Sequence, residues 1–231
     1  MIKNTLRQLK HFLTARRTSY SQTGEDLTMA FYLPEKPGFY VDVGANDPKH
    51  LNNSYYFYRR GWKGICVEPD RNKADWIKGL RRRDIVLQVG IGSADEVKTF
   101  FKLDPDTLST FSEEVANKYE ALGHRIVGRE EVSMRRLDSV FKEFGDTREI
   151  DFLSVDTEGD DLGVLESNDW QKYRPKMVLV EVAEYKRDEM RRYRGVFDNF
   201  FQGKGYWLLA DTHINAIYIE DGYARSKKLS P

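Results

Sequence analysis

The sequence has 231 residues, 40% of them hydrophobic, which is enough for one domain with a sizeable core. Lysine and arginine together number 37, as do aspartate and glutamate, so no overall charge draws the protein to nucleic acid. The single cysteine, Cys66, excludes an intrachain disulfide framework and favours a reducing, cytoplasmic setting. We expect this thiol to be buried and inert, because it lies within an apolar run.

The first 35 residues are expected to form an N-terminal helical appendage ahead of a main domain at 36–231. Basic side chains in segment 2–17 alternate with four apolar residues at helical spacing: Ile2, Leu6, Leu9 and Leu13. The segment is too short and too charged to span a bilayer, and it lacks the features of a secretory signal. Two interpretations remain open, a solvated helix packed on the domain or a peripheral helix that docks on a membrane or a partner.

Short apolar runs then alternate with amphipathic segments, a pattern typical of a parallel sheet covered by helices on both faces. The predicted strands are 39–44, 64–69, 85–90, 151–156 and 176–182. Helical periodicity indicates helices between them, at 53–61, 73–82, 137–145 and 161–169. The polar stretch 99–133 interrupts this pattern. It is expected to be either a lid or binding loop, or a surface excursion with its own helix.

A further helix is predicted at 187–203, followed by two apolar runs within 205–221. These runs are joined by Asp211, Thr212 and His213, which predicts an antiparallel hairpin that closes the sheet. An open, mostly parallel sheet of seven strands that ends in such a hairpin is an α/β arrangement. It belongs to the class I methyltransferase version of the Rossmann-like, doubly wound fold.

The stretch FYVDVGAND, residues 39–47, places Asp42, Gly44 and Asn46 at the end of the first strand. Ligands of open parallel sheets bind beyond the carboxyl ends of the strands. The turn lacks the further glycines of a dinucleotide fingerprint, and its acidic residues disfavour a pyrophosphate. Glu68, which ends the second strand, is placed to accept hydrogen bonds from ribose hydroxyls. Together these features favour S-adenosylmethionine, whose sulfonium and ammonium are cationic.

A second acidic cluster, DFLSVDTEGDD at 151–161, ends the fourth strand, and Glu181 ends the fifth. Asp156 and Glu158 are expected to reach the cofactor or the substrate. Asp156 and Glu181 are also candidates to hold a divalent cation such as Mg²⁺ through their oxygens. The alternative is that these carboxylates bind substrate hydroxyls directly.

Seven short motifs in one order resemble those of a known family. They are YSQTGEDL (20–27), DVGAND (42–47), CVEPD (66–70), LSTF (108–111), RLDSV (136–140), FLSVDTEGDDLGVL (152–165) and GYWLLADTHINAIYI (205–219). With them, the chain is similar to FkbM-type methyltransferases from about residue 20 to residue 220. The resemblance implies O-methylation from S-adenosylmethionine onto a hydroxyl of a sugar, glycan or secondary metabolite.

The resemblance also implies roles for individual residues. Those it assigns to the cofactor are Asp42, Gly44, Asn46 and Glu68. Gln22 and Asp26 would lie on a segment folded over the site, where Gln22 contacts the cofactor. Ser109 and Thr110 would lie near the cofactor or substrate, or else cap a helix ahead of Glu113. The chain departs from the family pattern at Pro48, where Gly is more usual, and at Asp161, where Glu is usual.

For activation of the acceptor hydroxyl, the candidate bases are Asp156 and Glu158, followed by His50, whose near-neutral pKa suits that role. His50 would otherwise be an ordinary loop histidine. The expected partner is a small-molecule or glycan acceptor rather than nucleic acid. The rival hypothesis is a non-catalytic scaffold with this fold, which docks a partner or a membrane through the basic N-terminal helix.

Overall fold

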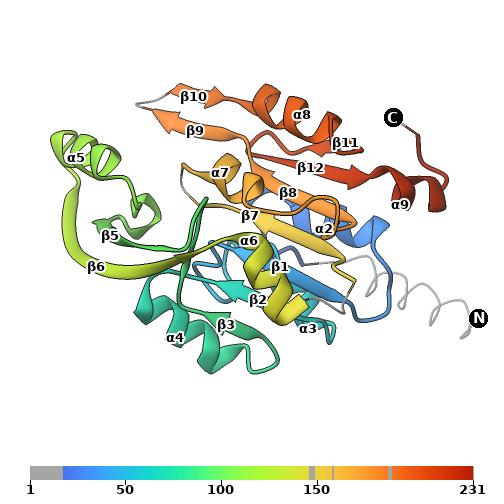
Figure 1. Ribbon diagram of the computed structural model, residues 1–231, viewed down its shortest axis with the longest axis horizontal. Coiled ribbons are helices and arrows are strands. Elements are labelled where there is room, and N and C mark those ends of the chain that lie inside the picture. Colours follow the sequence, from blue (N-terminus) through green and yellow to red (C-terminus); the bar gives the residue numbers. More distant parts are fainter. Residues whose placement is uncertain (1–17, 146–148, 158, 187–188, 231) are drawn as a thin grey trace, which may run out of the picture.

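The computed structural model describes residues 18–145, 149–157, 159–186 and 189–230 (Figure 1). Its centre is a seven-stranded sheet. From one edge to the other, the strands are β11 (Tyr206–Asp211), β12 (Asn215–Glu220), β8 (Met177–Glu181), β7 (Phe152–Val155), β1 (Phe39–Val43), β2 (Lys63–Val67) and β3 (Ile85–Leu87). Strand β12 runs antiparallel to β8 and β11, whereas the other neighbours are parallel. The predicted fold class, including its closing hairpin, is confirmed.

Helices cover both faces of this sheet, and strand alternation decides which side chains each face presents. In β1, Val41 and Val43 pack in one hydrophobic cluster and Tyr40 packs in the other. The first cluster includes side chains of α6 (Leu137–Val140), α7 (Asp161–Glu166) and α8 (Arg194–Gln202). The second includes those of α2 (Glu25–Tyr32), α3 (Tyr55–Arg59), α4 (Arg71–Leu80) and α9 (Asp221–Ser226).

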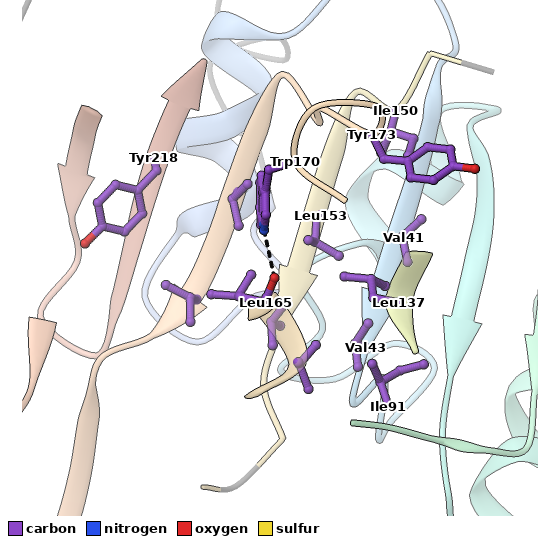
Figure 2. Packing of buried hydrophobic residues seen from close by; sticks show 14 of the residues in the cluster. Val41, Val43, Ile91, Leu137, Ile150, Leu153, Leu165, Trp170, Tyr173 and Tyr218 are labelled. Atoms are coloured by element: carbon purple, nitrogen blue, oxygen red, sulfur yellow. Dashed lines mark hydrogen bonds between the residues drawn. The ribbon is translucent and has the colours of Figure 1, made fainter. Parts of the chain in front are cut away.

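Figure 2 shows the first of these clusters from close by. Val41, Val43 and Leu153 from the central strands are buried there. The Trp170 ring belongs to the same cluster and packs edge-on against Phe200, Phe201 and Tyr206. The indole Nε1 of Trp170 donates a hydrogen bond to the backbone carbonyl of Leu165, at 2.8 Å. The polar atom of this buried side chain is therefore satisfied at the end of α7, which fixes α7 against the sheet.

The polar excursion is a β-ribbon that carries its own helix. Strands β5 (Glu96–Asp104) and β6 (Arg125–Arg135) pair antiparallel, and β6 also pairs with the short β4 (Gly90–Ile91). Between β5 and β6 lie a 3₁₀ turn (Asp106–Leu108) and α5 (Glu113–Ala121). Phe101, Leu103 and Ala116 form a small separate core. In Figure 1 this ribbon and the β9–β10 hairpin (Ala183–Lys186 and Glu189–Arg192) project from the same edge of the sheet.

The prediction of one helix over 187–203 is wrong at its start. Residues 189–192 form β10, which pairs with β9, and α8 begins only at Arg194. The segment reads Glu-Met-Arg-Arg, and each of these residue types favours a helix. Backbone pairing with β9 overrides that local preference, as tertiary context commonly does.

The described part of the N-terminal segment belongs to the core of the domain. Met29 and Leu33, on and just after α2, are buried in the second cluster. The helix predicted over 2–17 lies outside the described residues. Among the helices that the structure describes, none has the length and apolar character needed to cross a membrane.

Candidate functional site

A cavity of about 1070 Å³ opens at the carboxyl ends of β1, β2, β7 and β8 and is bordered by the β5–β6 ribbon. It brings together nine of the residues that the sequence singled out. They are Gln22, Asp42, Gly44, Asn46, Glu68, Ser109, Thr110, Asp156 and Glu181. Six of the nine lie at or just after the ends of β1, β2, β7 and β8, because parallel strands end at one edge of the sheet. The N-terminal segment brings Gln22 to the cavity, and the insertion between β5 and β6 brings Ser109 and Thr110.

The turn after β1 needs glycine at Gly44 for two reasons. Its φ is +82°, a left-handed conformation that side chains disfavour. A Cβ at this position would also lie 1.7 Å from the backbone oxygen of Asp156. The amide groups of Gly44 and Ala45 both donate to the Val67 carbonyl, at 3.0 and 3.1 Å, so the turn is held against the end of β2. Asn46 follows, also with a positive φ of 49°.

Glu68 joins the loops that follow β1 and β2. One carboxylate oxygen accepts the backbone N–H of Asn46, and the other accepts that of Asp70, each at 2.9 Å. Only 4% of the residue is exposed, and this burial raises its pKa to about 7, although both amide hydrogen bonds act in the opposite direction. Each oxygen retains a further lone pair that can accept a ligand hydroxyl.

Asp42 is buried behind the turn and is held by polar neighbours. The Ser54 hydroxyl donates to its carboxylate at 2.5 Å, and Ser54 itself accepts a hydrogen bond from the Arg81 guanidinium at 2.8 Å. Burial raises the pKa of Asp42, whereas the positive charge of Arg81 and the hydroxyl of Ser54 lower it. The Arg81 charge therefore favours the ionised form of this carboxyl. Sequence patterns gave no sign of this partner, which is 39 residues away along the chain.

The acidic cluster after β7 contains two carboxyl groups with raised pKa values. Burial, followed by the charges of Asp42 and Glu25, raises the pKa of Asp156 to about 6. Burial and the charge of Asp156 raise the pKa of Asp161 to about 7. One oxygen of Asp161 accepts both the N–H and the hydroxyl of Thr157, at 2.8 Å each. Two carboxyls poised near neutral pH in one cavity are typical of sites that move protons.

Two buried oxygen atoms on the cavity wall are unsatisfied. Within the part of the chain that the structure describes, Asn53 Oδ1 and Asp161 Oδ2 have no hydrogen-bond partner. Both residues line the cavity, and their exposed fractions are 8% and 3%. Because buried acceptors without donors are costly, a ligand that brings hydrogen-bond donors is favoured here.

The N-terminal segment places Gln22 on the cavity wall. Asp26, which is fully buried, accepts hydrogen bonds from the Ser19 hydroxyl and the Tyr20 amide, both at 2.7 Å, and from the Ser21 hydroxyl at 3.0 Å. Asp26 does not line the cavity, so it shapes the turn that carries Gln22.

Glu25 fastens the same segment to the closing hairpin. Its carboxylate accepts hydrogen bonds from the Thr212 hydroxyl and the Asn215 amide, at 2.8 Å each, and from Thr23. Burial opposes ionisation of this carboxyl, but its hydrogen bonds prevail and its pKa is lowered. The motif GEDL thus holds its position through two buried carboxylates.

The remaining predicted residues differ in where they lie. Ser109 and Thr110 line the cavity, and the cap of α5 is Ser112, whose hydroxyl accepts the Val115 amide, so the capping alternative is wrong. His50 is exposed on the β1–α3 loop and is not among the cavity residues, which removes support for its role as a base. Glu158 lies outside the described residues.

The predicted Mg²⁺ site is not supported. Across residues 18–145, 149–157, 159–186 and 189–230, no group of three or more His, Cys, Asp or Glu side chains is placed to hold a metal ion. Asp156 and Glu181 both line the cavity.

Comparisons with known proteins gave one family match and several similar solved structures. The family model described as a methyltransferase FkbM domain matches residues 42–221. A search of curated proteins found no sequence match. Among solved structures, the chain is similar to a TehB-like SAM-dependent methyltransferase from Corynebacterium glutamicum, with 11% identity, a TM-score of 0.47 and 94% and 97% of the two chains covered. It is also similar to a methyltransferase from Geobacter sulfurreducens, with 12% identity, a TM-score of 0.44 and 95% and 89% coverage.

Proposed function

Because the chain belongs to the FkbM methyltransferase family, we propose that it transfers a methyl group from S-adenosylmethionine to a hydroxyl of a sugar, glycan or secondary metabolite. The observation that carries this proposal is the wall of the cavity, where carboxylates, a tight glycine turn and unsatisfied acceptors meet. In this proposal the enzyme acts in the cytoplasm and its partner is the acceptor itself, not nucleic acid.

The residues of the cavity suit the methyl donor. Glu68 directly follows β2 and lines the cavity, and each of its carboxylate oxygens, which already accepts one amide, can accept one hydroxyl of a ribose. Gly44 lines the cavity, and because it has no side chain this turn can pack directly against the Asp156 backbone at the end of β7. The acidic residues Asp42 and Asp156 offer negative charge to a cationic ligand. When bound, the donor supplies an electrophilic methyl group.

A hydroxyl acceptor is supported by the hydrogen-bonding capacity of the wall. Asn53 Oδ1, and Asp161 Oδ2 when that carboxyl is ionised, need donors, and a polyhydroxylated acceptor brings several. A phosphate group would bring none at neutral pH, and it would meet the carboxylates of Asp156 and Asp161. The acceptor is thus proposed to be a hydroxyl-rich compound.

Asp156 is the proposed general base. It lines the cavity at the end of β7, and its pKa of about 6 leaves it mostly ionised at neutral pH while it stays basic enough to take a proton. The Asp161 carboxyl is held close to the same loop by Thr157. Placement of the acceptor oxygen in line with the methyl group is the larger contribution, about 7–11 kcal/mol in favourable cases.

Calorimetry and a methyl-transfer screen test the proposal. We expect S-adenosylmethionine and its demethylated product to bind at micromolar concentrations and NAD to give no heat. The screen would offer radiolabelled donor to glycans, nucleotide sugars and neutral polyols, with and without a chelator, and we expect transfer to a neutral polyol. Heat from NAD alone would contradict the proposal. Binding of the donor without transfer to any hydroxyl acceptor would favour a non-catalytic scaffold.

A further inference from the structure

The β5–β6 ribbon and the two cofactor loops are joined by an electrostatic network centred on α4. We propose that Lys73 is a positioning residue that couples docking of the ribbon to binding of the cofactor. This inference rests on the proposed function, since it concerns the same site, but it adds a residue and a mechanism to which neither the motifs nor the family match points.

Lys73 bridges the turn after β1 and the ribbon. Its Nζ donates a hydrogen bond to Asn46 Oδ1 at 2.5 Å and pairs with Asp106 Oδ2 at 2.8 Å. Asn46 lies in the turn after β1, and its own backbone amide donates to Glu68. Asp106 begins the 3₁₀ turn between the two strands of the ribbon. The Lys73 side chain is 18% exposed and that of Asp106 is 64% exposed, and both residues line the cavity, so one partly buried lysine contacts both segments at the site itself.

A second bridge connects the ribbon to the loop after β2. Lys102 of β5 pairs with Asp70 at 2.9 Å and with Glu130 of β6 at 2.8 Å. Asp70 caps α4 by accepting the amides of Asn72 and Lys73, and its own amide donates to Glu68. The ribbon is therefore connected to Glu68, the carboxylate proposed to bind ribose, through the Lys102–Asp70 ion pair and the hydrogen bond from the Asp70 amide.

These two bridges make ribbon docking and ligand binding depend on one another. Glu68 accepts the amides of Asn46 and Asp70. Asn46 is held by Lys73, which pairs with the ribbon, and Asp70 is held by Lys102, which belongs to the ribbon. When the ribbon is docked, the two loops that face the cofactor are ordered before it arrives, which lowers the entropic cost of binding. By linkage, a bound cofactor must favour the docked ribbon by the same factor.

An ion pair at the far end of β5 and β6 provides a matched control. Arg125, the first residue of β6, pairs with Asp104, the last residue of β5, at 2.6 Å, and their side chains are 75% and 55% exposed. Exposed pairs of this kind contribute little. Arg125 does not line the cavity, so its loss tests whether any removed charge on the ribbon has the same effect.

The experiment measures the affinity for S-adenosylhomocysteine by calorimetry in the wild type, Lys73→Met, Lys73→Arg, Asp106→Asn and the double variant Lys73→Met/Asp106→Asn. We expect Lys73→Met to weaken binding about tenfold and Asp106→Asn about threefold, and Lys73→Arg to restore most of the loss. The double variant should bind no more weakly than Lys73→Met alone, because both substitutions break one bridge. Arg125→Met should bind as the wild type does.

Hydrogen exchange of the 104–124 insertion gives a readout that does not depend on activity. We expect the ligand to slow exchange there in the wild type and to leave it nearly unchanged in Lys73→Met. Wild-type affinity in Asp106→Asn would overturn the proposal, since Lys73 would then act by touching the ligand itself. If the wild type binds the ligand and neither Lys73→Met nor Asp106→Asn weakens binding, the coupling alone is overturned. If the wild type does not bind the ligand, the proposed function is overturned and the coupling with it.

Discussion

Arg81 and Asp84 form an ion pair at 2.7 Å in which neither side chain has any exposed surface. The same guanidinium donates to the hydroxyls of Tyr40 and Ser54, at 2.7 and 2.8 Å, and the Ser54 hydroxyl in turn donates a hydrogen bond to the Asp42 carboxylate. A buried positive charge is thus fixed beneath the turn that follows β1. The same buried charge therefore contributes both to the stability of the second hydrophobic cluster and to the ionisation of Asp42, which lines the cavity.

Arg81→Met should destabilise the protein by about 3–5 kcal/mol, because it leaves the buried Asp84 carboxylate without its partner. Chemical denaturation followed by circular dichroism measures the loss. Arg82→Met is the control, since Arg82 is exposed and lies one residue along the chain, and we expect its effect to stay within about 0.5 kcal/mol. Equal stability of the two variants would show that the buried pair does not hold the structure together.

Gly44→Ala should abolish cofactor binding and lower the stability by at least about 1–2 kcal/mol. The residue has a φ of +82°, and the new Cβ would collide with the backbone oxygen of Asp156. Thermal unfolding and calorimetry check the two effects. Gly79→Ala provides the contrast, because Gly79 lies within α4 with open space around its Cβ, and there we expect a gain of about 0.5–1 kcal/mol.

The sequence was sufficient to predict the sheet and the edge at which the site lies, because both follow from short-range patterns. Apolar runs and turn residues predicted the strands, and Asp42, Gly44 and Glu68 fell at strand ends that parallel topology brings together. The helix predicted from residue 187 began too early, since strand pairing between β9 and β10 is not encoded in helical propensity.

The networks that support the site could not be predicted in this way. Arg81 and Lys73 look like ordinary surface residues of an amphipathic helix, and nothing in their spacing indicates which distant group each one meets. Arg81 reaches Ser54 across 27 positions, and Lys73 reaches Asp106 across 33. Lys73 lies in the first turn of α4, just after the ligand-binding end of β2, and this is its only local signal, whereas Arg81 follows the other end of the helix and has none.

Glu68 should make stability depend on pH in a way that Glu68→Gln removes. Burial raises its folded pKa to about 7 from an ordinary value of 4.5, so between these values the folded state binds more protons than the unfolded state. The contribution of Glu68 to stability is therefore complete below about pH 4.5 and is lost as pH rises through about 7, a change of about 3 kcal/mol.

Chemical denaturation of the wild type and of Glu68→Gln between pH 4.5 and 8 checks this contribution. The other titrating groups cancel in the difference between the two free energies of unfolding. The wild type should lose stability relative to Glu68→Gln as pH rises. Affinity for the cofactor should change in the opposite direction, since the ionised carboxylate is the stronger acceptor for hydroxyls. A stability difference that is constant with pH would place the pKa of Glu68 near its ordinary value.

Asp156→Asn should lower kcat by about 10²–10⁴-fold at saturating cofactor and acceptor, because the amide cannot take a proton from the acceptor hydroxyl. In the wild type, kcat should rise with pH through about 6, the pKa of Asp156, and then level off, since only the ionised carboxyl acts as a base. This rising limb should be missing in the variant.

Asp160→Asn removes an exposed carboxylate from the same loop and should keep both the rising limb and most of kcat. A variant at Asp156 that retains the wild-type profile would mean that another group accepts the proton, and Asp161, with its pKa of about 7, would then be the group to replace next.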